Sequence, residues 1–205
     1  MTPDSLAKQR SRGRRKPGRP ATIRLTGGQW RGTRLPVTDA DGLRPTAERV
    51  RETLFNWLAP MIEGAHCIDC FAGTGALGLE ALSRGAAHVD FFDTDRTTAN
   101  ALRERLDMLG ANTRATVTAS DFRHASLPAS SIDIAFVDPP FAHELQHAAI
   151  ERLRPALTSN ARVYFEHPAA QAHEFASLID PVLETLRHKR AGAVGFGLAR
   201  PYTAG

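Results

Sequence analysis

The stretch Ile68-Asp69-Cys70-Phe71-Ala72-Gly73-Thr74-Gly75-Ala76-Leu77-Gly78-Leu79-Glu80-Ala81-Leu82 decides the fold. An apolar run that ends in an acid, then a glycine-rich turn, then alanine and leucine at helical spacing predict a strand, a tight loop and a helix. Gly73, Gly75 and Gly78 have the G-x-G-x-x-G spacing, which allows a sharp turn, close approach of a ligand and close helix–strand packing. Dinucleotide and S-adenosylmethionine sites both use such loops, and glycines at a strand-to-helix turn can also be purely structural.

Strand and helix patterns alternate from residue 66 onward. The expected strands are 66–70, 88–92, 113–119, 132–137 and 162–166, with helices at 76–84, 96–109 and 143–153 between them. This order implies right-handed crossovers and a parallel sheet. Residues 182–189 and 194–199 predict a closing hairpin, and Val50, Leu54, Trp57 and Leu58 predict an amphipathic helix over 46–58. The predicted fold is therefore α/β and Rossmann-like, with a mostly parallel sheet.

The first 45 residues differ in composition from this domain. Residues 1–20 hold seven of the 26 basic residues and one of the 22 acids, with almost no apolar side chain, which predicts a disordered basic tail. Residues 21–45 contain two alternating runs around Gly27-Gly28, which predict a small N-terminal β-hairpin. The expected organisation is a tail over 1–20, the hairpin extension over 21–45 and one catalytic domain over 46–205.

Basic residues near the N-terminus indicate a polyanionic partner, most commonly a phosphate backbone. Trp30 in the hairpin could stack on a base or cover the apolar side of the hairpin. Arg49 and Arg51 also fit a solvated helix face. The candidate RNA contacts are Arg24, Trp30, Arg31, Arg34, Arg44, Arg49 and Arg51.

Several classes of protein are excluded by composition. No apolar segment has the length of a signal peptide or a membrane span, so we expect a cytoplasmic protein without a membrane partner. Cys67 and Cys70 lack a second pair of ligands at metal spacing, and an offset of three in a strand points them to opposite faces. We therefore expect packed thiols and no metal.

Acids stand at the ends of the next strands. Asp93 lies 20 residues after Gly73, where a carboxylate can accept both hydroxyls of an adenosine ribose. Asp95 is expected to cap the following helix, although the two roles could be exchanged. Asp69 could orient the glycine loop or bind a cofactor ammonium. Asp121 and Phe122 offer an acceptor and a ring for adenine, or an ordinary loop with a buried phenylalanine.

The strand 132–137 leads into Asp138-Pro139-Pro140-Phe141. Two prolines remove backbone donors and fix φ, so they create a rigid rim with free carbonyls. An exocyclic amine fits this rim, with one N–H to the Asp138 carboxylate, another to the Pro139 carbonyl and its base on Phe141. Such an arrangement directs the nitrogen lone pair at a methyl sulfonium, and a nicotinamide dehydrogenase has no use for it.

These residues resemble a known family. Asp-Pro-Pro-Phe at 138–141 resembles the Asn/Asp-Pro-Pro-aromatic motif of S-adenosylmethionine-dependent amino-group methyltransferases, and 71–75 resembles their cofactor loop. More closely, the stretches 27–32, 43–46, 49–58 and 69–84 resemble the RsmD family of bacterial 16S ribosomal RNA guanine-N2 methyltransferases. The resemblance covers roughly residues 22–200, and the long arginine-rich tail and 120–122 depart from it.

The resemblance implies a class I methyltransferase with a seven-stranded sheet, S-adenosylmethionine as cofactor and 16S rRNA of the small ribosomal subunit as substrate, at the guanine 966 type of position. A monomer is expected, and ribosomal proteins near the target could be additional partners. The cofactor residues expected are Asp69, Phe71, Ala72, Gly73, Thr74, Gly75, Gly78, Asp93, Asp121 and Phe122, with Asp138, Pro139, Pro140 and Phe141 catalytic. Three alternatives stay open at this point: methylation of adenine N6 or another nucleic acid, an NAD-dependent oxidoreductase, and an RNA-binding assembly protein that transfers no methyl group.

Overall fold

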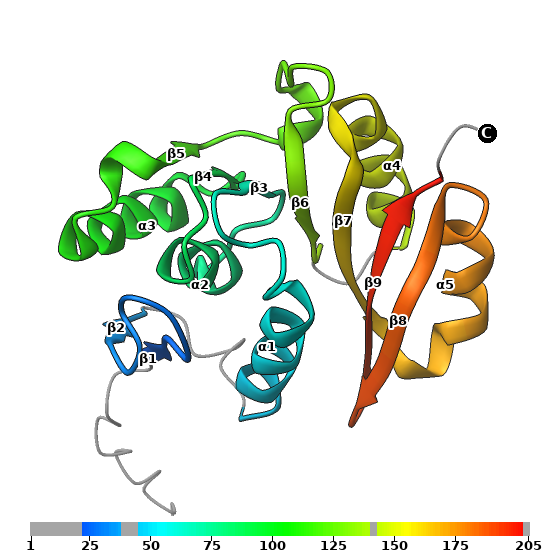
Figure 1. The fold of residues 1–205 in the computed structure, drawn as a ribbon, viewed down its shortest axis with the longest axis horizontal. Helices are drawn as coiled ribbons and strands as arrows, with labels where there is room; N and C mark the ends of the chain where they lie inside the picture. Colours follow the sequence, from blue (N-terminus) through cyan, green and yellow to red (C-terminus); the bar gives the residue numbers. More distant parts are fainter. Residues whose placement is uncertain (1–21, 38–44, 140–142, 203–205) are drawn as a thin grey trace, which may run out of the picture.

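A seven-stranded sheet forms the centre of the protein, whose computed structural model describes residues 22–37, 45–139 and 143–202 (Figure 1). The strand order is β5-β4-β3-β6-β7-β9-β8, with β3 at His66–Asp69, β4 at His88–Phe92, β5 at Ala115–Thr118, β6 at Ile132–Val137, β7 at Leu157–Pro168, β8 at Leu183–Ala191 and β9 at Val194–Pro201. The strands β5, β4, β3, β6 and β7 are parallel, and β9 is antiparallel to both β7 and β8. The predicted sheet and its closing hairpin are confirmed.

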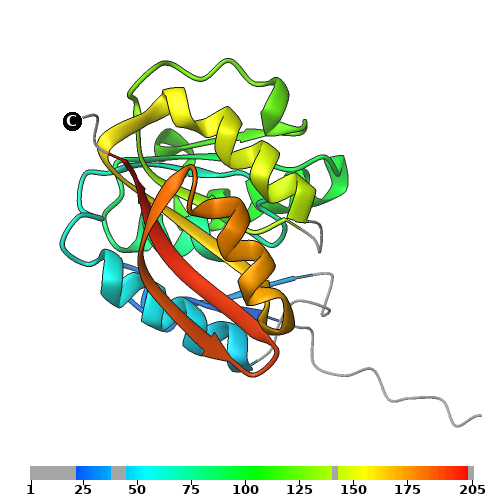
Figure 2. The ribbon, with the colours of Figure 1, turned by 90° about the vertical axis from the view of Figure 1, so that its right-hand side faces the viewer.

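Helices cover both faces of this sheet. They are α1 at Pro45–Leu58, α2 at Ala76–Ser83, α3 at Arg96–Leu109, α4 at His143–Leu153 and α5 at Ala172–Ile179. The side chains of α1, α2 and α3 pack into one core cluster with Cys67, and those of α4 and α5 pack into a second cluster with Ile68. Cys67 and Ile68 are neighbours on β3 and point to opposite faces, so the two clusters lie on opposite sides of the sheet. Figure 2 shows α1 on one side of β8 and β9 and α4 and α5 on the other.

Short elements complete the domain. The 3₁₀ turns are η1 at Asn112–Arg114, η2 at Phe122–His124, η3 at Arg154–Ala156 and η4 at Ala169–Gln171. Helix α5 was not predicted from the sequence. The two cysteines are buried free thiols that belong to different core clusters, as expected from their offset. Across the described ranges, no helix has the length and apolarity needed to cross a bilayer.

The N-terminal hairpin pairs β1 at Thr22–Arg24 with β2 at Arg34–Pro36 in antiparallel register. The predicted turn at Gly27-Gly28 is wrong, because residues 25–33 form a wider connection between the strands. Two of its backbone N–H groups bind α2 instead of the facing strand: Gln29 donates to the Ser83 carbonyl at 2.6 Å and Trp30 to the Ser83 hydroxyl at 3.0 Å. Contacts with α2 therefore set the shape of this connection.

Candidate active site

Three carboxylates lie at the carboxyl ends of neighbouring strands. Asp69 ends β3, Asp93 directly follows β4 and Asp138 directly follows β6. Strands β4 and β6 flank β3 in the sheet, so the three acids share the edge at which the chain order reverses. Open α/β sheets bind their ligands in the crevice at such a switch point.

The three glycines that follow β3 provide the sharp turn and the close packing that their spacing predicted. Gly73 and Gly75 have φ values of +50° and +78°, which side-chain-bearing residues rarely adopt. Gly78 faces the Phe91 ring of β4, where an added Cβ would come within 2.1 Å of a ring carbon. A Cβ at Gly73 would meet only the Phe71 carbonyl, at 3.9 Å, so open space lies beside that residue. The loop thus packs tightly against the sheet and leaves room at Gly73.

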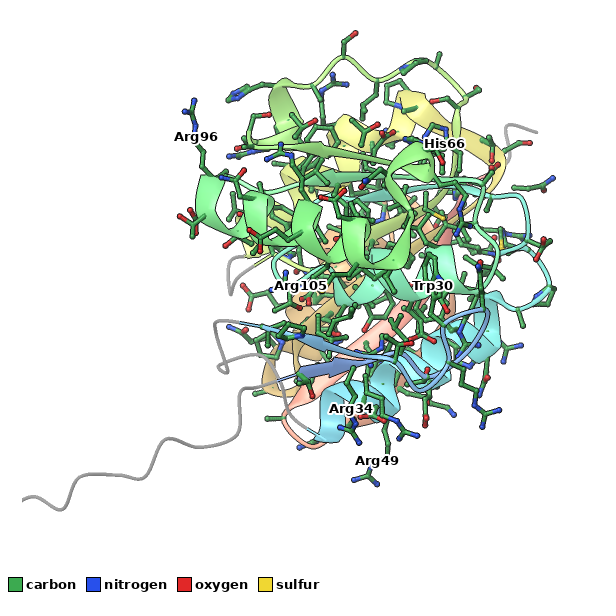
Figure 3. The ribbon with its side chains drawn as sticks, turned by 90° about the vertical axis from the view of Figure 1, so that its left-hand side faces the viewer. Trp30, Arg34, Arg49, His66, Arg96 and Arg105 are labelled. Carbon is green, nitrogen blue, oxygen red and sulfur yellow. The ribbon has the colours of Figure 1, made fainter. Side chains whose placement is uncertain are left out.

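The remaining loop residues are held by their backbones. The Ala72 N–H donates to the Phe92 carbonyl at 2.8 Å, and the Thr74 carbonyl accepts from Arg105 of α3 at 3.5 Å. Arg105 also donates to the Pro36 carbonyl at 2.9 Å, so one buried guanidinium connects the end of β2 to the loop. Figure 3 shows Arg105 at this place, between the hairpin and α3.

Asp69 is buried beneath the loop, with an exposed fraction of 3%. Its Oδ2 accepts the Gly78 N–H at 3.2 Å, so it orients the start of α2. Desolvation raises the pKa of Asp69 to about 7, the backbone hydrogen bonds to its carboxylate lower it, and the nearby charge of Asp93 raises it further. A positively charged ligand group beside Asp69 would therefore stabilise its ionised form.

Asp93 and Asp95 have different environments. Asp93 is half-buried, and its Oδ2 accepts the Gly73 N–H at 2.8 Å across the loop. Asp95 is exposed and caps α3: it accepts from the Thr97 N–H at 2.9 Å and from the Thr98 hydroxyl at 2.9 Å. These hydrogen bonds hold the pKa of Asp95 below its ordinary value. The predicted cap is confirmed, and only Asp93 of the two hydrogen-bonds the glycine loop.

Asp121 and Phe122 are arranged differently from the adenine site predicted for them. Asp121 caps η2 through the Arg123 N–H and also binds the Arg123 guanidinium, which lowers its pKa. Phe122 is fully buried, with its ring 5.5 Å from Phe71 and 6.4 Å from Phe92. Of the two environments predicted for Phe122, the structure has the buried one, because its ring belongs to the second core cluster.

Asp138 begins the rim that the two prolines were predicted to form. The residue is exposed at the end of β6 and Pro139 is buried, whereas Pro140 and Phe141 lie outside the described residues. Although solvent reaches Asp138, the surrounding protein still desolvates its carboxyl group and raises its pKa well above the ordinary value. Repulsion by Glu166 and Asp69 raises this pKa further.

Glu166 is a candidate site residue that the sequence reasoning missed. It lies on β7, one strand from Asp138, and its Oε1 accepts the Tyr164 hydroxyl at 2.5 Å. Desolvation raises the pKa of Glu166, so two carboxyl groups with raised pKa values lie side by side at this edge. The available signal was an acid near the carboxyl end of a strand next to β6, which is the same signal that identified Asp93.

Four arginines predicted to contact RNA are exposed, on the N-terminal hairpin and at the start of α1. Arg31, Arg34 and Arg49 are exposed, and Arg24 is exposed in an ion pair with Glu48 at 3.3 Å; Figure 3 shows Arg34 and Arg49 in these two elements. Arg44 lies outside the described residues. Trp30 is half-buried against the first core cluster, with the Arg114 guanidinium 5.2 Å from its ring centroid. Of its two predicted roles, Trp30 therefore has the packing role.

Arg51 is not a surface residue, so the prediction that it contacts RNA is wrong. Its side chain is buried, donates to the Arg24 carbonyl at 2.6 Å and lies 3.4 Å from Glu80. Glu80 also accepts from Thr26 of the hairpin connection and from Arg84, which directly follows α2. This buried network fastens the hairpin and α1 to α2, which explains the position of Arg51 on the inner side of α1.

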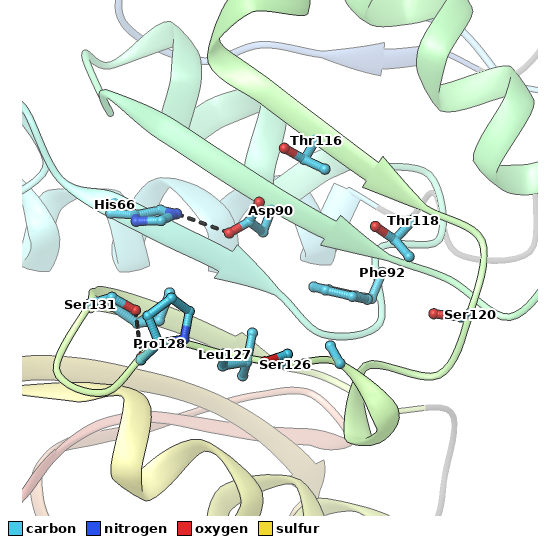
Figure 4. A pocket seen from close by; sticks show the side chains of 12 residues that line it. His66, Asp90, Phe92, Thr116, Thr118, Ser120, Ser126, Leu127, Pro128 and Ser131 are labelled. Atoms are coloured by element: carbon cyan, nitrogen blue, oxygen red, sulfur yellow. Dashed lines mark hydrogen bonds and ion pairs between the residues drawn. The ribbon is translucent and has the colours of Figure 1, made fainter.

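A recess of about 360 Å³ opens on one face of β3, β4 and β5, while α2 and α3 cover the other face. Figure 4 shows His66 and Asp90 in this recess. Within the described part of the chain, His66, His88 and Asp90 are the group that could hold a metal ion. However, both Asp90 oxygens already face a histidine, at 2.9 Å from His66 and 3.3 Å from His88, and the His88 ring lies 2.9 Å from the Thr116 hydroxyl. These groups satisfy one another without an ion.

Comparisons with known proteins identify the family of this chain. The model of the family described as "Conserved hypothetical protein 95" matches residues 23–199. Ribosomal RNA small subunit methyltransferase D of Escherichia coli strain K12 is 48% identical over 146 residues, which are 70% of this chain and 74% of that protein. The protein of the same name from Haemophilus influenzae is 39% identical over 189 residues, or 89% and 95% of the two chains.

A solved structure gives the same result for the fold. The Escherichia coli protein yhhF superposes with a TM-score of 0.78 at 40% identity, over 88% of this chain and 98% of that one. The range matched by the family model includes the hairpin, the glycine loop and β6 with Asp138 after it. The chain belongs to the ribosomal RNA small subunit methyltransferase D family.

Proposed function

We propose that this protein transfers a methyl group from S-adenosylmethionine to the exocyclic N2 amine of a guanine in 16S rRNA of the small ribosomal subunit, at the guanine 966 type of position. The observation that carries the proposal is the convergence of Asp69, Asp93 and Asp138 on one switch point beside the glycine loop. Family membership supports both the reaction and the ribosomal substrate.

The residues around the glycine loop fit the proposed cofactor. Asp69 is a buried carboxylate that pairs with no cation among the described residues, and the ammonium of a methionine group would supply one. Asp93 lies across the open space at Gly73 and retains acceptor capacity for the two ribose hydroxyls. Phe71, Ala72 and Thr74 would shape the loop, and Asp121 is assigned no contact here because Arg123 occupies its carboxylate.

The strand end at Asp138 favours guanine. An ionised carboxylate only accepts hydrogen bonds, and guanine presents N1–H and N2–H side by side as donors. Adenine places an acceptor N1 beside its amine, which an Asp138 carboxylate would repel. In the proposed complex Asp138 accepts from the base, the Pro139 carbonyl accepts the second amine hydrogen, and Phe141 stacks on the ring.

The cofactor supplies an electrophilic methyl group on a sulfonium. The N2 lone pair forms the new N–C bond as the S–C bond breaks, and the proton that the methylated amine then loses passes to Asp138 or to water. Because an amine needs no strong base for this attack, most of the rate enhancement comes from positioning by Asp138 and Pro139. Desolvation and then the charge of Glu166 raise the pKa of Asp138, which favours uptake of this proton by its carboxylate.

The RNA would approach the protein over the N-terminal hairpin and α1, where the exposed arginines lie. Arg24, Arg31, Arg34 and Arg49 would contact phosphates, which position the substrate without reading its sequence. We propose the same role for Arg44 and for the basic tail over residues 1–20, and we no longer assign base stacking to Trp30. The organisation into tail, hairpin extension and catalytic domain is part of this proposal.

A methyl-transfer assay tests the proposal. Purified protein is incubated with radiolabelled S-adenosylmethionine and small ribosomal subunits isolated from cells that lack the modification. Label should enter the RNA with the wild-type protein, and Asp138→Ala should lower the rate on the order of a hundredfold while cofactor binding stays nearly intact, as for other positioned polar groups. Cofactor binding without transfer of label would favour an RNA-binding assembly protein, and NAD binding would favour an oxidoreductase.

A further inference from the structure

A groove of about 450 Å³ lies between α1 and the hairpin formed by β8 and β9. Arg49, Val50 and Thr53 line it from α1, and Lys189, Arg190 and Phe196 line it from the hairpin. Three positive charges therefore face one concave surface, and no acidic residue lines it within the described part of the chain. Sequence reasoning had identified Arg49 but neither of the cations on β8.

The groove lies on the same edge and the same face of the sheet as Asp138. Val137 of β6 pairs with Phe165 of β7, and the next residue of β7, Glu166, pairs with Phe196 of β9. Side chains two residues apart on a strand share a face, so Asp138 lies on the α1 side, as Phe136 does. Strand spacing places β9 about 10 Å from β6, across β7. The basic groove therefore begins about two strand widths from the proposed reaction site.

Two of the three cations of the groove, Lys189 and Arg190, are held in place without being neutralised. The Lys189 ammonium lies 5.7 Å from the centroid of the Trp57 ring, and Trp57 stacks on Phe196 at 5.6 Å. The Arg190 guanidinium donates to the Gly192 carbonyl at 2.8 Å. Arg49, Lys189 and Arg190 form no ion pair with any acid of the described residues. Like charges held together in this way repel one another, and a polyanion relieves the repulsion.

We infer that this groove binds the phosphate backbone of the RNA a few nucleotides from the methylated base, and so presents the target to Asp138. The inference rests on the proposed function, because it takes small-subunit RNA as the substrate. Contacts to phosphates add salt-dependent affinity and register without reading bases, which suits a groove that offers cations and few other polar groups. Lys189 and Arg190 are thus positioning residues for the substrate.

The test neutralises the two hairpin cations in the full-length protein. Binding of small ribosomal subunits that lack the modification is measured over a range of KCl concentrations for wild type and for Lys189→Gln/Arg190→Gln. The logarithmic salt slope should fall by about 1.4 to 1.8 for two lost phosphate contacts. KM for the subunit should rise, whereas kcat at saturating subunit and the affinity for S-adenosylmethionine should stay as in wild type.

Two matched variants control for charge and for folding. Arg154→Gln/Arg162→Gln removes the same charge nearer the amino ends of the strands, because Arg154 lies in η3 before β7 and Arg162 pairs with Ile134 of β6. This variant should leave the slope unchanged. Lys189→Arg/Arg190→Lys keeps the charges and should behave as wild type. An unchanged slope for Lys189→Gln/Arg190→Gln would overturn the inference. An equal fall of the slope for Arg154→Gln/Arg162→Gln would overturn it as well. If the wild-type protein methylates subunits, such a result rejects only RNA binding by the groove. If the wild-type protein does not methylate subunits, the proposed function itself is rejected.

Discussion

The Asp93 carboxylate accepts the backbone N–H of Gly73 at 2.8 Å, across the loop that joins β3 to α2. The bond connects the ends of two neighbouring strands through residues that are 20 positions apart in the chain. Asp93 therefore has two tasks in the proposed site: it shapes the glycine loop, and it presents acceptors to the open space beside Gly73.

The first prediction concerns cofactor affinity. Asp93→Ala should weaken S-adenosylmethionine binding by about 2 to 4 kcal/mol, because two hydrogen bonds to a charged acceptor are lost and the loop loses its anchor. Calorimetry with the cofactor and its demethylated product measures this. Asp95→Ala is the matched control: it should lower the melting temperature, because a helix cap is lost, and leave cofactor affinity nearly unchanged. The reverse pattern would move the ribose contact to Asp95.

The second prediction concerns stability and pH. The pKa of Asp69 is about 7 in the folded protein against an ordinary value of 3.8. The folded state therefore favours the protonated carboxyl group, and ionisation of Asp69 destabilises the fold. The stability of the cofactor-free protein should therefore fall as pH rises from about 4 to about 7. Asp69→Asn should remove this loss, with a gain of at most about 4 kcal/mol near pH 8, and should weaken cofactor binding. Denaturant titrations at several pH values measure it, and parallel pH curves for the two proteins would contradict the assignment.

The third prediction concerns the pH dependence of catalysis. The proposed contact with guanine needs an ionised Asp138, whose pKa is raised by desolvation and by Glu166. The rate should therefore increase with pH, with its inflection above the ordinary range of a carboxyl group. Glu166→Gln removes the neighbouring charge and should move the inflection to lower pH. The control is Glu184→Gln, which alters an acid of β8 paired with Arg200 and should not move the inflection. A rate that is flat between pH 5 and pH 8 would speak against an ionised Asp138 in the reaction.

The fourth prediction separates two arginines of α1. Arg51→Met should destabilise the protein by about 3 to 5 kcal/mol, because it breaks a buried pair and leaves the Arg24 carbonyl without its donor. Arg49→Gln should leave the melting temperature within about a degree, since an exposed side chain is lost, and should weaken RNA binding. Thermal unfolding and subunit binding of both variants measure this. Equal stability losses would mean that Arg49 is also structural.

Much of the domain could be predicted from the sequence, because local signals agree with the tertiary fold. Strands β4 and β6 and helices α3 and α4 have the predicted bounds. Helix α3 shows why: Asp95 caps its start, and Gly110, with a φ of +63°, ends it. The acids at the strand ends were found because the topology of a parallel sheet brings such positions to one edge.

The misses have tertiary causes. The hairpin connection takes its shape from Ser83, which lies more than 50 residues away in the chain. The sequence predicted Arg51 on a solvated helix face or at an RNA contact, because its partner Glu80 belongs to another helix. The sequence left Phe122 open to two roles, a ring against adenine or a buried phenylalanine, and contacts with Phe71 and Phe92 accompany the buried position. In each case the deciding contact joins segments whose spacing in the sequence gives no signal.

The most direct test of the central claim is mass spectrometry of nucleosides from small ribosomal subunits that lack the modification and have been treated with this protein and S-adenosylmethionine. The proposed function predicts N2-methylguanosine at one position of 16S rRNA, formed by the wild-type protein and almost absent with Asp138→Ala. N6-methyladenosine in its place, or an Asp138→Ala protein as fast as wild type, would contradict it.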